Sequence, residues 1–437
     1  MHSHTRRSTT HPFLWLTAGR RLMQLMLISI AGCLATAVAA SPLPATSNAH
    51  WITTWTASPQ PLWAGDFPLP THVPFNVWNQ TLRQTARISV GGRSVRIQLS
   101  NAYGTTPLVV GAAHLALAGN GADIVNGTDR PITFSGRRSV IIPPGAPALS
   151  DPIDLGVAAL QRVSVSLYLP HPTAPSTFHW DGRQTAYVVT GDQTANASIT
   201  PESTLTSRLF LSAILVDAPS TTRTVVALGD SITDGAGATM DRDTRWPDFL
   251  AARLADKQVA VLNAGISGAR LLQDKMGDNA LARLDRDVLS QPGIASAIVL
   301  IGINDISWNH MAFAPNDDAA DAEQLIAGYR QLIARAHARD VRIIGGTLTP
   351  FEGALKDTPL IGYYAADKER VRQTVNDWIR HSGEFDDVVD FDALLRDPAH
   401  PTRLLPAYDS GDHLHPGDAG NKAMAETVDL KALLRPQ

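Results

Sequence analysis

The chain has 437 residues, of which 44% are hydrophobic and 18% are charged, and its formal net charge at pH 7 is -4. This composition is that of an ordinary globular protein, and the length allows two domains that each have a core. The small net charge and the lack of a long basic run argue against a nucleic-acid partner.

The first forty residues have the order of a signal peptide. Arg20 and Arg21 precede an apolar run over 22–34, and small residues follow with a predicted cleavage site near Ala39 or Ala40. The apolar run is shorter than the roughly 20 residues that a membrane-spanning helix needs. We therefore expect an exported protein, secreted or periplasmic, without an integral membrane span after processing.

Besides an uncleaved anchor, two other interpretations of this segment stay open. The run Ile30-Ala31-Gly32-Cys33 resembles a bacterial lipoprotein box, in which Cys33 would carry a lipid anchor. Arg20-Arg21 begins a weak match to a twin-arginine export signal. Cys33 is the only cysteine, so cleavage at Ala40 leaves no disulfide, no thiol nucleophile and no Cys-ligated zinc site. Covalent chemistry must then come from Ser, Thr, Lys or a carboxylate.

Hydrophobic residues alternate with period two from about residue 51 to 215, as they do in strands. The runs 86–90 and 93–99, joined by Gly91-Gly92, predict a β-hairpin with a two-residue turn. The run 162–169 alternates just as clearly. Several short strands with turn residues between them predict an antiparallel β-sandwich or jelly roll.

Tryptophans are frequent in this β-rich region. Aromatic rings stack on sugars at carbohydrate-binding surfaces, but they are equally common in protein cores. Rings aligned on one exposed face would favour binding of carbohydrate. The tryptophans are Trp51, Trp55, Trp63, Trp78 and Trp180.

After residue 224 the pattern changes to short apolar strands that alternate with helices. The strand leading to Ser231 is followed by predicted strands at 259–262, 298–301, 341–345 and 388–389. Helices are predicted at 246–256, 278–289, 320–339, 364–381 and 418–434. This order predicts a parallel sheet with helices on both sides.

Four polar blocks follow predicted strands or precede the last helix. Because loops after parallel strands converge at one edge of a sheet, these blocks are expected to share one site. They are Gly229-Asp230-Ser231, the run 263–268 that ends in Gly268, the run 302–305 that contains Asn304, and Asp412-His413-Leu414-His415-Pro416.

The four blocks resemble those of the GDSL lipase/acylhydrolase family, also called SGNH hydrolases, in order and spacing from Arg223 to about Leu434. Ile232-Thr233 stands where the family name has Leu. The resemblance implies a flavodoxin-like parallel sheet, catalysis without metal or cofactor, and a defined set of site residues. These are Ser231 as nucleophile, His415 as base, Asp412 as its orienting carboxylate, and Ser231, Gly268 and Asn304 as oxyanion-hole donors.

The chemistry of these residue types agrees with that implication. A serine hydroxyl is a weak nucleophile, and it needs a neutral imidazole whose tautomer is fixed by an acceptor. Asp412 and His415 are three residues apart, so one turn could present both side chains on the same side. Backbone N–H groups and an Asn amide can stabilise the negative charge that develops on the attacked carbonyl oxygen.

The predicted organisation has four parts. The β-rich domain has the sandwich or jelly-roll character described above, and the last domain has the SGNH hydrolase fold. The parts are a signal peptide at 1–40, a β-rich accessory domain at 41–216, a linker at 217–222 and the hydrolase domain at 223–437.

The predicted function is a serine ester hydrolase that removes small acyl groups, such as acetyl, from carbohydrate, with acetylated polysaccharide as a possible partner. A lysophospholipase or arylesterase would use the same residues. A carbohydrate-binding protein without activity is a further alternative. A metallophosphoesterase is another, with Asp230, Asn304, His413 and His415 as ligands. We expect Asp234, Asp305 and His413 to be structural, and the run 308–311 either to line the substrate pocket or to pack.

Overall fold

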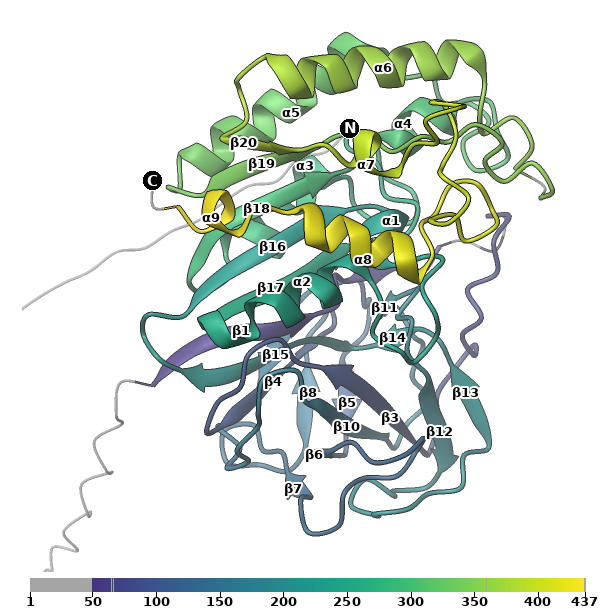
Figure 1. Cartoon of the computed structure of the whole chain (residues 1–437). Coiled ribbons are helices and arrows are strands. Elements are labelled where there is room, and N and C mark those ends of the chain that lie inside the picture. The colour runs from purple at the N-terminus through teal and green to yellow at the C-terminus, as the bar shows by residue number, and fades with distance from the viewer. Residues whose placement is uncertain (1–48, 64, 66, 359, 436–437) are drawn as a thin grey trace, which may run out of the picture. The chain divides into compact units, whose positions relative to one another are not determined.

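The computed structural model describes residues 49–63, 65, 67–358 and 360–435 (Figure 1). The predicted signal peptide, both possible cleavage sites and the lipoprotein box at Cys33 lie outside these residues. Over the described ranges, no helix combines the length and the apolar character needed to cross a membrane.

Short strands make up the β-rich part of the chain. Their bounds are β1 His50–Thr56, β2 Gln60–Pro61, β3 Gln80–Arg87, β4 Val95–Ser100, β5 Leu108–Val110, β6 Ala112–Leu117, β7 Arg130–Pro131, β8 Val140–Ile142, β9 Pro147–Leu149, β10 Arg162–Leu169, β11 Thr177–His179, β12 Ala186–Thr190, β13 Ser203–Leu205, β14 Arg208–Leu209 and β15 Leu211–Ala218.

Two antiparallel sheets of this part face each other across one core. One sheet has the strand order β1-β15-β4-β9, and the other has the order β13-β12-β3-β10-β6-β7. Ile97 and Ile214 from the first sheet share a buried hydrophobic cluster with Leu82 and Val165 from the second. Two sheets packed over a common core form a β-sandwich, which confirms the predicted class for this region.

The predicted hairpin across Gly91-Gly92 is wrong. β3 ends at Arg87 and pairs with β10 and β12, whereas β4 begins at Val95 and pairs with β15 in the other sheet. The two glycines lie where the chain crosses between the sheets, and Gly92 exchanges two 2.9 Å backbone hydrogen bonds with Val157. A Cβ at position 91 would lie 2.4 Å from the Val157 carbonyl oxygen, so glycine here permits close backbone approach.

The second part of the chain contains the predicted parallel sheet, with strand order β17-β16-β18-β19-β20. This order is the flavodoxin-like one, in which the first strand lies between the second and the third. Val225 to Leu228 are fully buried, as expected for a strand covered on both faces. The strand bounds are β16 Arg223–Gly229, β17 Val259–Gly265, β18 Ile294–Leu300, β19 Arg342–Gly346 and β20 Asp387–Val389.

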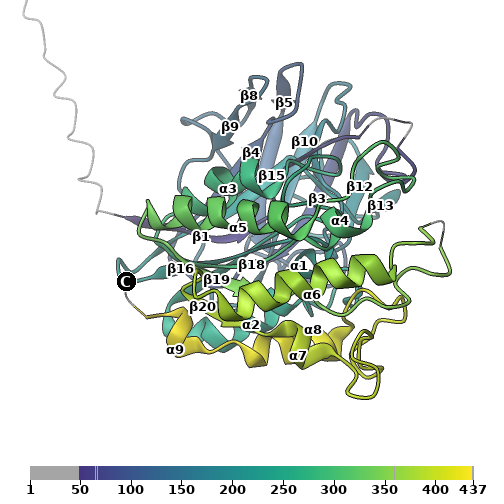
Figure 2. The same ribbon diagram turned by 90° about the horizontal axis from the view of Figure 1, so that it is seen from above.

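Helices cover both faces of this sheet. α2 packs on α8, whereas α5 packs on α3 and α6, and Figure 2 shows α2 and α8 on the opposite side of the strands from α3 and α5. The helix bounds are α1 Ser231–Asp234, α2 Trp246–Leu254, α3 Ala280–Leu284, α4 Ile303–Ser307, α5 Ala322–His337, α6 Ala366–His381, α7 Phe391–Leu395, α8 Asp418–Thr427 and α9 Leu430–Leu433.

The predicted single helix at 418–434 is two helices. Val428 has an extended backbone, with ψ of 121°, and this ends α8. The side chain of Asp429 then accepts a 2.8 Å hydrogen bond from the N–H of Lys431 and caps α9. A capping aspartate stabilises a new helix start, so the apolar periodicity continues through the break while the helix does not.

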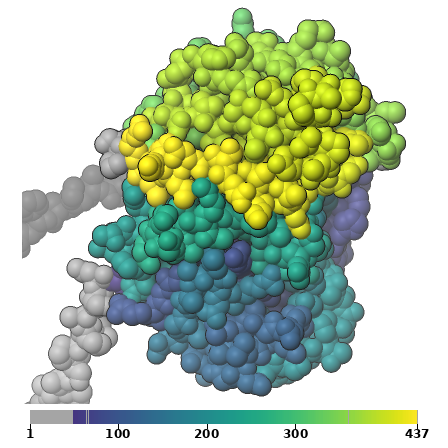
Figure 3. Space-filling model, viewed as in Figure 1, coloured from purple at the N-terminus to yellow at the C-terminus, as the bar shows by residue number. Residues whose placement is uncertain are grey.

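The β-rich part covers the edge of the parallel sheet at β17. The N–H of Val261 donates to Ser89 Oγ over 3.2 Å, and Thr56 Oγ1 donates to the carbonyl of Asn263 over 3.1 Å. Edge strands with free backbone groups tend to pair with other chains, so these side chains protect it. In Figure 3 the two parts lie directly against each other. Residues 48–437 form one unit, and the domain boundary at 217–222 stays a prediction.

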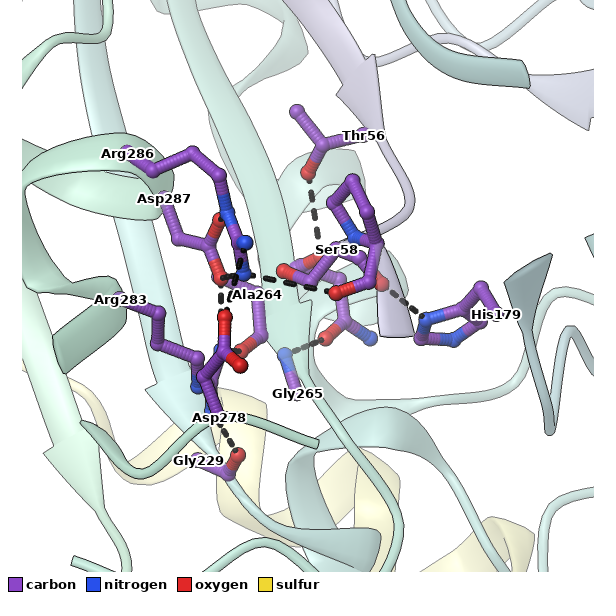
Figure 4. A network of polar contacts seen from close by, with 12 residues as sticks. Thr56, Ser58, His179, Gly229, Ala264, Gly265, Asp278, Arg283, Arg286 and Asp287 are labelled. Atoms are coloured by element: carbon purple, nitrogen blue, oxygen red, sulfur yellow. Dashed lines mark hydrogen bonds and ion pairs between the residues drawn. The ribbon is translucent and has the colours of Figure 1, made fainter. Parts of the chain in front are cut away.

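A buried arginine holds the ends of two parallel strands together (Figure 4). Arg283 is fully buried and donates to the carbonyls of Gly229 and Ala264, the last residue of β16 and the last but one of β17. It also pairs with Asp287 over 3.0 Å. These bonds satisfy two backbone carbonyls at the point where β16 leads into Ser231.

We expect Arg283→Met to lower the free energy of unfolding by about 3 kcal/mol, because it leaves buried carbonyls and a buried carboxylate without this partner. Equilibrium unfolding in urea measures the change. Arg335→Met is the matched control, since Arg335 also bonds a carbonyl and a carboxylate, those of Leu281 and Asp285, but does so at the surface. Arg335→Met should lower the free energy of unfolding by at most about 1 kcal/mol. Equal losses in the two variants would contradict the structural role of Arg283.

Candidate active site

Ser231 lies where β16 ends, at the carboxyl edge of the parallel sheet. Asp230 caps the short helix α1, and its side chain accepts a 3.0 Å hydrogen bond from the N–H of Ile232. A Cβ at Gly229 would lie 2.6 Å from the carbonyl oxygen of Leu300 on β18, so only glycine allows this close packing. The turn therefore presents Ser231 at the position where open α/β sheets carry their ligand sites.

The loop before α8 brings two further side chains to Ser231. His415 Nε2 lies 2.8 Å from Ser231 Oγ, and His415 Nδ1 lies 2.6 Å from Asp412 Oδ2. Asp412 Oδ1 accepts hydrogen bonds from the backbone N–H groups of Leu414 and His415. Because a carboxylate only accepts, Nδ1 carries a proton, and the lone pair of Nε2 faces the serine hydroxyl.

Asp412 is held in its charged form. Burial opposes ionisation, but the hydrogen bonds and charge of His415 outweigh it and hold the pKa of Asp412 well below its usual range. The carboxylate can therefore fix the imidazole tautomer and stabilise a positive charge on His415.

Gly268 lies in the loop that follows β17, and Asn304 of α4 bonds the next residue of that loop. Gly268 has φ of +77°, and a Cβ there would lie 3.0 Å from the Trp308 ring and closer still to Met276. Asn304 is buried in α4, where its Nδ2 donates to the carbonyl of Ala269 over 2.9 Å and its Oδ1 accepts from the Tyr363 hydroxyl. The second Nδ2 hydrogen of Asn304 is left for another acceptor.

Two buried carboxylates hold both ends of this loop. Asp234 Oδ2 accepts from the N–H and the hydroxyl of Ser267, each over 2.8 Å. Asp305 accepts from the N–H groups of Leu271 and Leu272, over 2.7 and 2.9 Å. Burial raises the pKa of Asp305 to about 6. Both aspartates, which we expected to be structural, thus fix the loop that carries Gly268.

Asp230 lies directly beside Ser231 and is 1% exposed. Its Oδ2 makes no hydrogen bond to any residue that the structure describes. Burial raises the pKa of Asp230 to about 7, although the N–H of Ile232 and the charge of His415 lower it. The carboxyl group is therefore largely protonated in weakly acidic solution.

The second histidine of the last block points to a different partner. His413 Nδ1 lies 2.6 Å from Asp409 Oδ2, and His413 is partly exposed. Among the residues with described positions, no three His, Asp or Glu side chains are arranged to hold one metal ion. The contacts of His413 thus agree with the structural role expected for it.

The tryptophans of the β-rich part do not form one exposed row. Trp55 is buried, Trp51 lies under the guanidinium of Arg96, and Trp78 is 64% exposed. Trp63 and Trp180 contact each other, with ring centroids 5.7 Å apart.

Trp63 and Trp180 instead belong to an aromatic cluster shared by both parts of the chain. Trp63 contacts Phe67, which stacks on Phe313 with centroids 5.1 Å apart, and Phe313 contacts Trp308. The cluster therefore reaches Gly268 through Trp308. The frequency of tryptophan in protein cores allowed a packing role for Trp63 and Trp180, but the sequence gave no signal for this contact.

One residue of the β-rich part that was not predicted contacts Asp234, which holds the loop of Gly268. His179, at the end of β11, lies 2.9 Å from Asp234 Oδ1 through its Nε2. A single buried histidine in a strand gives no sequence signal for a partner 55 positions away.

Replacing Asp230 by asparagine tests the raised pKa. Between about pH 4 and 7 an unfolded Asp230 loses its proton while the folded one keeps it, so its contribution to the free energy of unfolding falls as pH rises. Asp230→Asn removes this loss. As the pH rises across this range, we expect the free energy of unfolding of the variant to increase relative to that of the parent by up to about 4 kcal/mol.

Urea unfolding at several pH values measures that difference. Asp256→Asn, at an exposed position, is the control, and its free energy of unfolding should depend on pH in parallel with that of the parent. Parallel curves for Asp230→Asn as well would contradict an elevated pKa at Asp230.

Comparison with known proteins identifies one family. The model of the GDSL-like lipase/acylhydrolase family matches residues 225–428. Comparison with curated proteins gave no match.

Similar solved structures include a GDSL-like lipase from Bacteroides thetaiotaomicron (19% identity, 48% of this chain and 87% of that one, TM-score 0.36). A lipase/acylhydrolase from Enterococcus faecalis is 19% identical, with 49% of this chain and 99% of that one covered and a TM-score of 0.37. An acetyl xylan esterase is 21% identical, with 47% of this chain and 95% of that one covered and a TM-score of 0.34. Because these likenesses are remote, the assignment rests on the family model. Residues 225–428 thus match the family of GDSL-like lipases/acylhydrolases, and this match covers somewhat less than half of the chain.

Proposed function

We propose that the chain is an exported serine ester hydrolase that works through an acyl-enzyme on Ser231 and removes small acyl groups, such as acetyl, from carbohydrate. The observation that carries the mechanism is the continuous hydrogen-bond path from Asp412 through His415 to Ser231 Oγ. Such a path activates a hydroxyl that would otherwise be a weak nucleophile.

In the acylation step, Ser231 Oγ forms a bond to the ester carbonyl carbon while His415 Nε2 takes the hydroxyl proton. The carbonyl π electrons move to oxygen, and Asp412 stabilises the imidazolium. When the tetrahedral intermediate collapses, the bond to the alcohol oxygen breaks and His415 returns the proton to that oxygen. Water then attacks the acyl-enzyme with His415 again as base, which releases the acid and restores Ser231.

Three donors are proposed to hold the oxyanion: the N–H groups of Ser231 and Gly268 and the Nδ2 of Asn304. Neither N–H is hydrogen-bonded to another described residue, and Asn304 uses only one of its two Nδ2 hydrogens internally. Donors that are fixed before reaction stabilise developing charge without reorganising. The carboxylates Asp234 and Asp305 support this arrangement because they fix the loop between them.

The proposal of a short acyl group is supported by the crowding beside Gly268. Met276 and Trp308 are both 2% exposed and press against the glycine, so bulky side chains already fill the space next to the loop. Export is supported by the order of charged, apolar and small residues in 1–40. Activity on lysophospholipids or aryl esters would require the same catalytic residues.

We expect His415→Gln to lower kcat by at least about 10⁴-fold, because no other described group lies in hydrogen-bond contact with Ser231 Oγ to accept its proton. His413→Gln is the matched control: that histidine also bonds an aspartate over 2.6 Å, two positions away, but pairs with Asp409. Its kcat should stay within about twofold of the parent. Steady-state hydrolysis of p-nitrophenyl acetate measures both. Equal losses would contradict a specific role for His415.

We expect kcat/KM to fall at least about tenfold from p-nitrophenyl acetate to p-nitrophenyl octanoate, since the longer acyl chain must fit beside Met276 and Trp308. The panel runs from acetate to palmitate beside acetylated xylan, from which released acetate is measured. Ser231→Ala provides the background rate. A preference for long chains would exclude the deacetylase proposal and favour a lipase or lysophospholipase.

A further inference from the structure

His179 of the β-rich part is 5% exposed and lies between two acceptors. Its Nδ1 is 3.0 Å from the carbonyl oxygen of Ser58, and its Nε2 is 2.9 Å from Asp234 Oδ1. Figure 4 shows the ring directed toward Ser58. Carbonyl and carboxylate oxygens cannot donate, so both bonds form only when both ring nitrogens carry protons. The geometry therefore requires an imidazolium that is paired with the carboxylate of Asp234.

The charge state agrees with this geometry. Burial alone would lower the pKa of His179, but the charge of Asp234 and its hydrogen bond outweigh burial and raise it. The buried Arg208 and Arg245 lie on the same small cavity as His179 and Asp234.

Asp234 transmits this contact to the proposed oxyanion loop. It is the last residue of α1, the helix that begins at Ser231, and its Oδ2 accepts both bonds from Ser267. Ser267 directly precedes Gly268. One carboxylate therefore joins three segments: the helix of the nucleophile, the loop of the proposed donor and a histidine from a different sheet.

The same surface of the β-rich part also contacts the chain after α1. Thr185 bonds Asp241 through its N–H and hydroxyl, over 2.6 and 2.7 Å, and Arg162 pairs with Asp243 over 2.6 Å. The segment from α1 to Asp243 is therefore held from the β-rich side at several points, of which His179 is the one nearest to the proposed oxyanion loop.

We propose that His179 is a positioning residue for ester hydrolysis: by pairing with Asp234 it fixes Ser267 and so aims the N–H of Gly268 at the oxyanion. The β-rich part then completes the active site of the α/β part. A buried ion pair adds little net stability compared with apolar packing, so stability alone gives no reason for placing one here. The inference rests on the proposed function, since it assigns His179 to that same site.

The test uses the full chain with His179→Gln, which can bond Asp234 or Ser58 but cannot carry the charge. A misplaced donor weakens the transition state more than the bound ester. We expect kcat for p-nitrophenyl acetate to fall about 10- to 100-fold while KM changes less than about threefold. The inhibition constant of phenylboronic acid, whose tetrahedral Ser231 adduct places an oxygen in the oxyanion hole, should rise by a similar factor.

His114→Gln is the matched control. His114 also bonds an aspartate, Asp129, over 2.9 Å, but it lies within the sheet of β6 and makes its contact inside the β-rich part. Its kcat and its boronate inhibition constant should stay within about twofold of the parent. Circular dichroism and thermal unfolding establish that each variant is folded.

Asp234→Asn is the second variant and keeps the inference testable if His179→Gln does not fold. Its amide can accept from His179 with one atom but then presents an N–H to Ser267, which donates, so the loop must shift. The same loss of kcat and of boronate affinity is expected. When both single variants fold, the double variant should lose no more kcat than the less active single variant, because both substitutions disturb the same chain of contacts to Ser267.

The outcomes separate this inference from the proposed function. A folded His179→Gln or Asp234→Asn with unchanged kcat and boronate affinity would overturn the positioning role while the esterase proposal stands. A loss of kcat in which boronate affinity is unchanged would also overturn it, because oxyanion stabilisation would be intact. If the parent chain hydrolyses no ester and Ser231→Ala is indistinguishable from it, the proposed function fails instead.

Discussion

Two buried carboxylates fix the loop after β17, which has no regular secondary structure of its own. Asp234 accepts two hydrogen bonds at one end of the loop and Asp305 accepts two at the other. Asp234 belongs to the helix that follows β16, and Asp305 to the helix that follows β18. In the sheet, β16 lies between β17 and β18. The loop after β17 is therefore fixed to the segments that follow β16 and β18. The position of Gly268 is thus set by charges that the fold has buried.

Two carboxylates near His415, those of Asp412 and Asp230, differ in charge state. The bonds of His415 keep Asp412 ionised, whereas burial raises the pKa of Asp230 to about 7. Negative charge is therefore present where an imidazolium would form and reduced directly beside Ser231, where an oxyanion would form. A second charged carboxylate beside the serine would oppose that oxyanion, so the burial that raises the pKa of Asp230 favours the proposed chemistry.

The sequence predicted the parallel sheet and brought its four polar blocks to one edge, because buried strands and their terminal loops have strong local patterns. Ser231, Asp412 and His415 do lie in hydrogen-bond contact. The failures have local causes too. Gly91-Gly92 matched the residue preferences of a hairpin turn, yet the glycines serve a crossing between sheets, and Asp429 broke a helix whose apolar periodicity continued.

Contacts between the two parts of the chain could not be predicted in this way. The bond from His179 to Asp234 joins residues from different sheets, and neither residue has a local pattern that indicates the other. The same interface covers the edge of β17 through Ser89 and Thr56. Protecting that edge also fixes β17, and β17 leads directly into the loop of Gly268. The contacts that cover this edge strand therefore also hold the strand from which the loop of Gly268 begins.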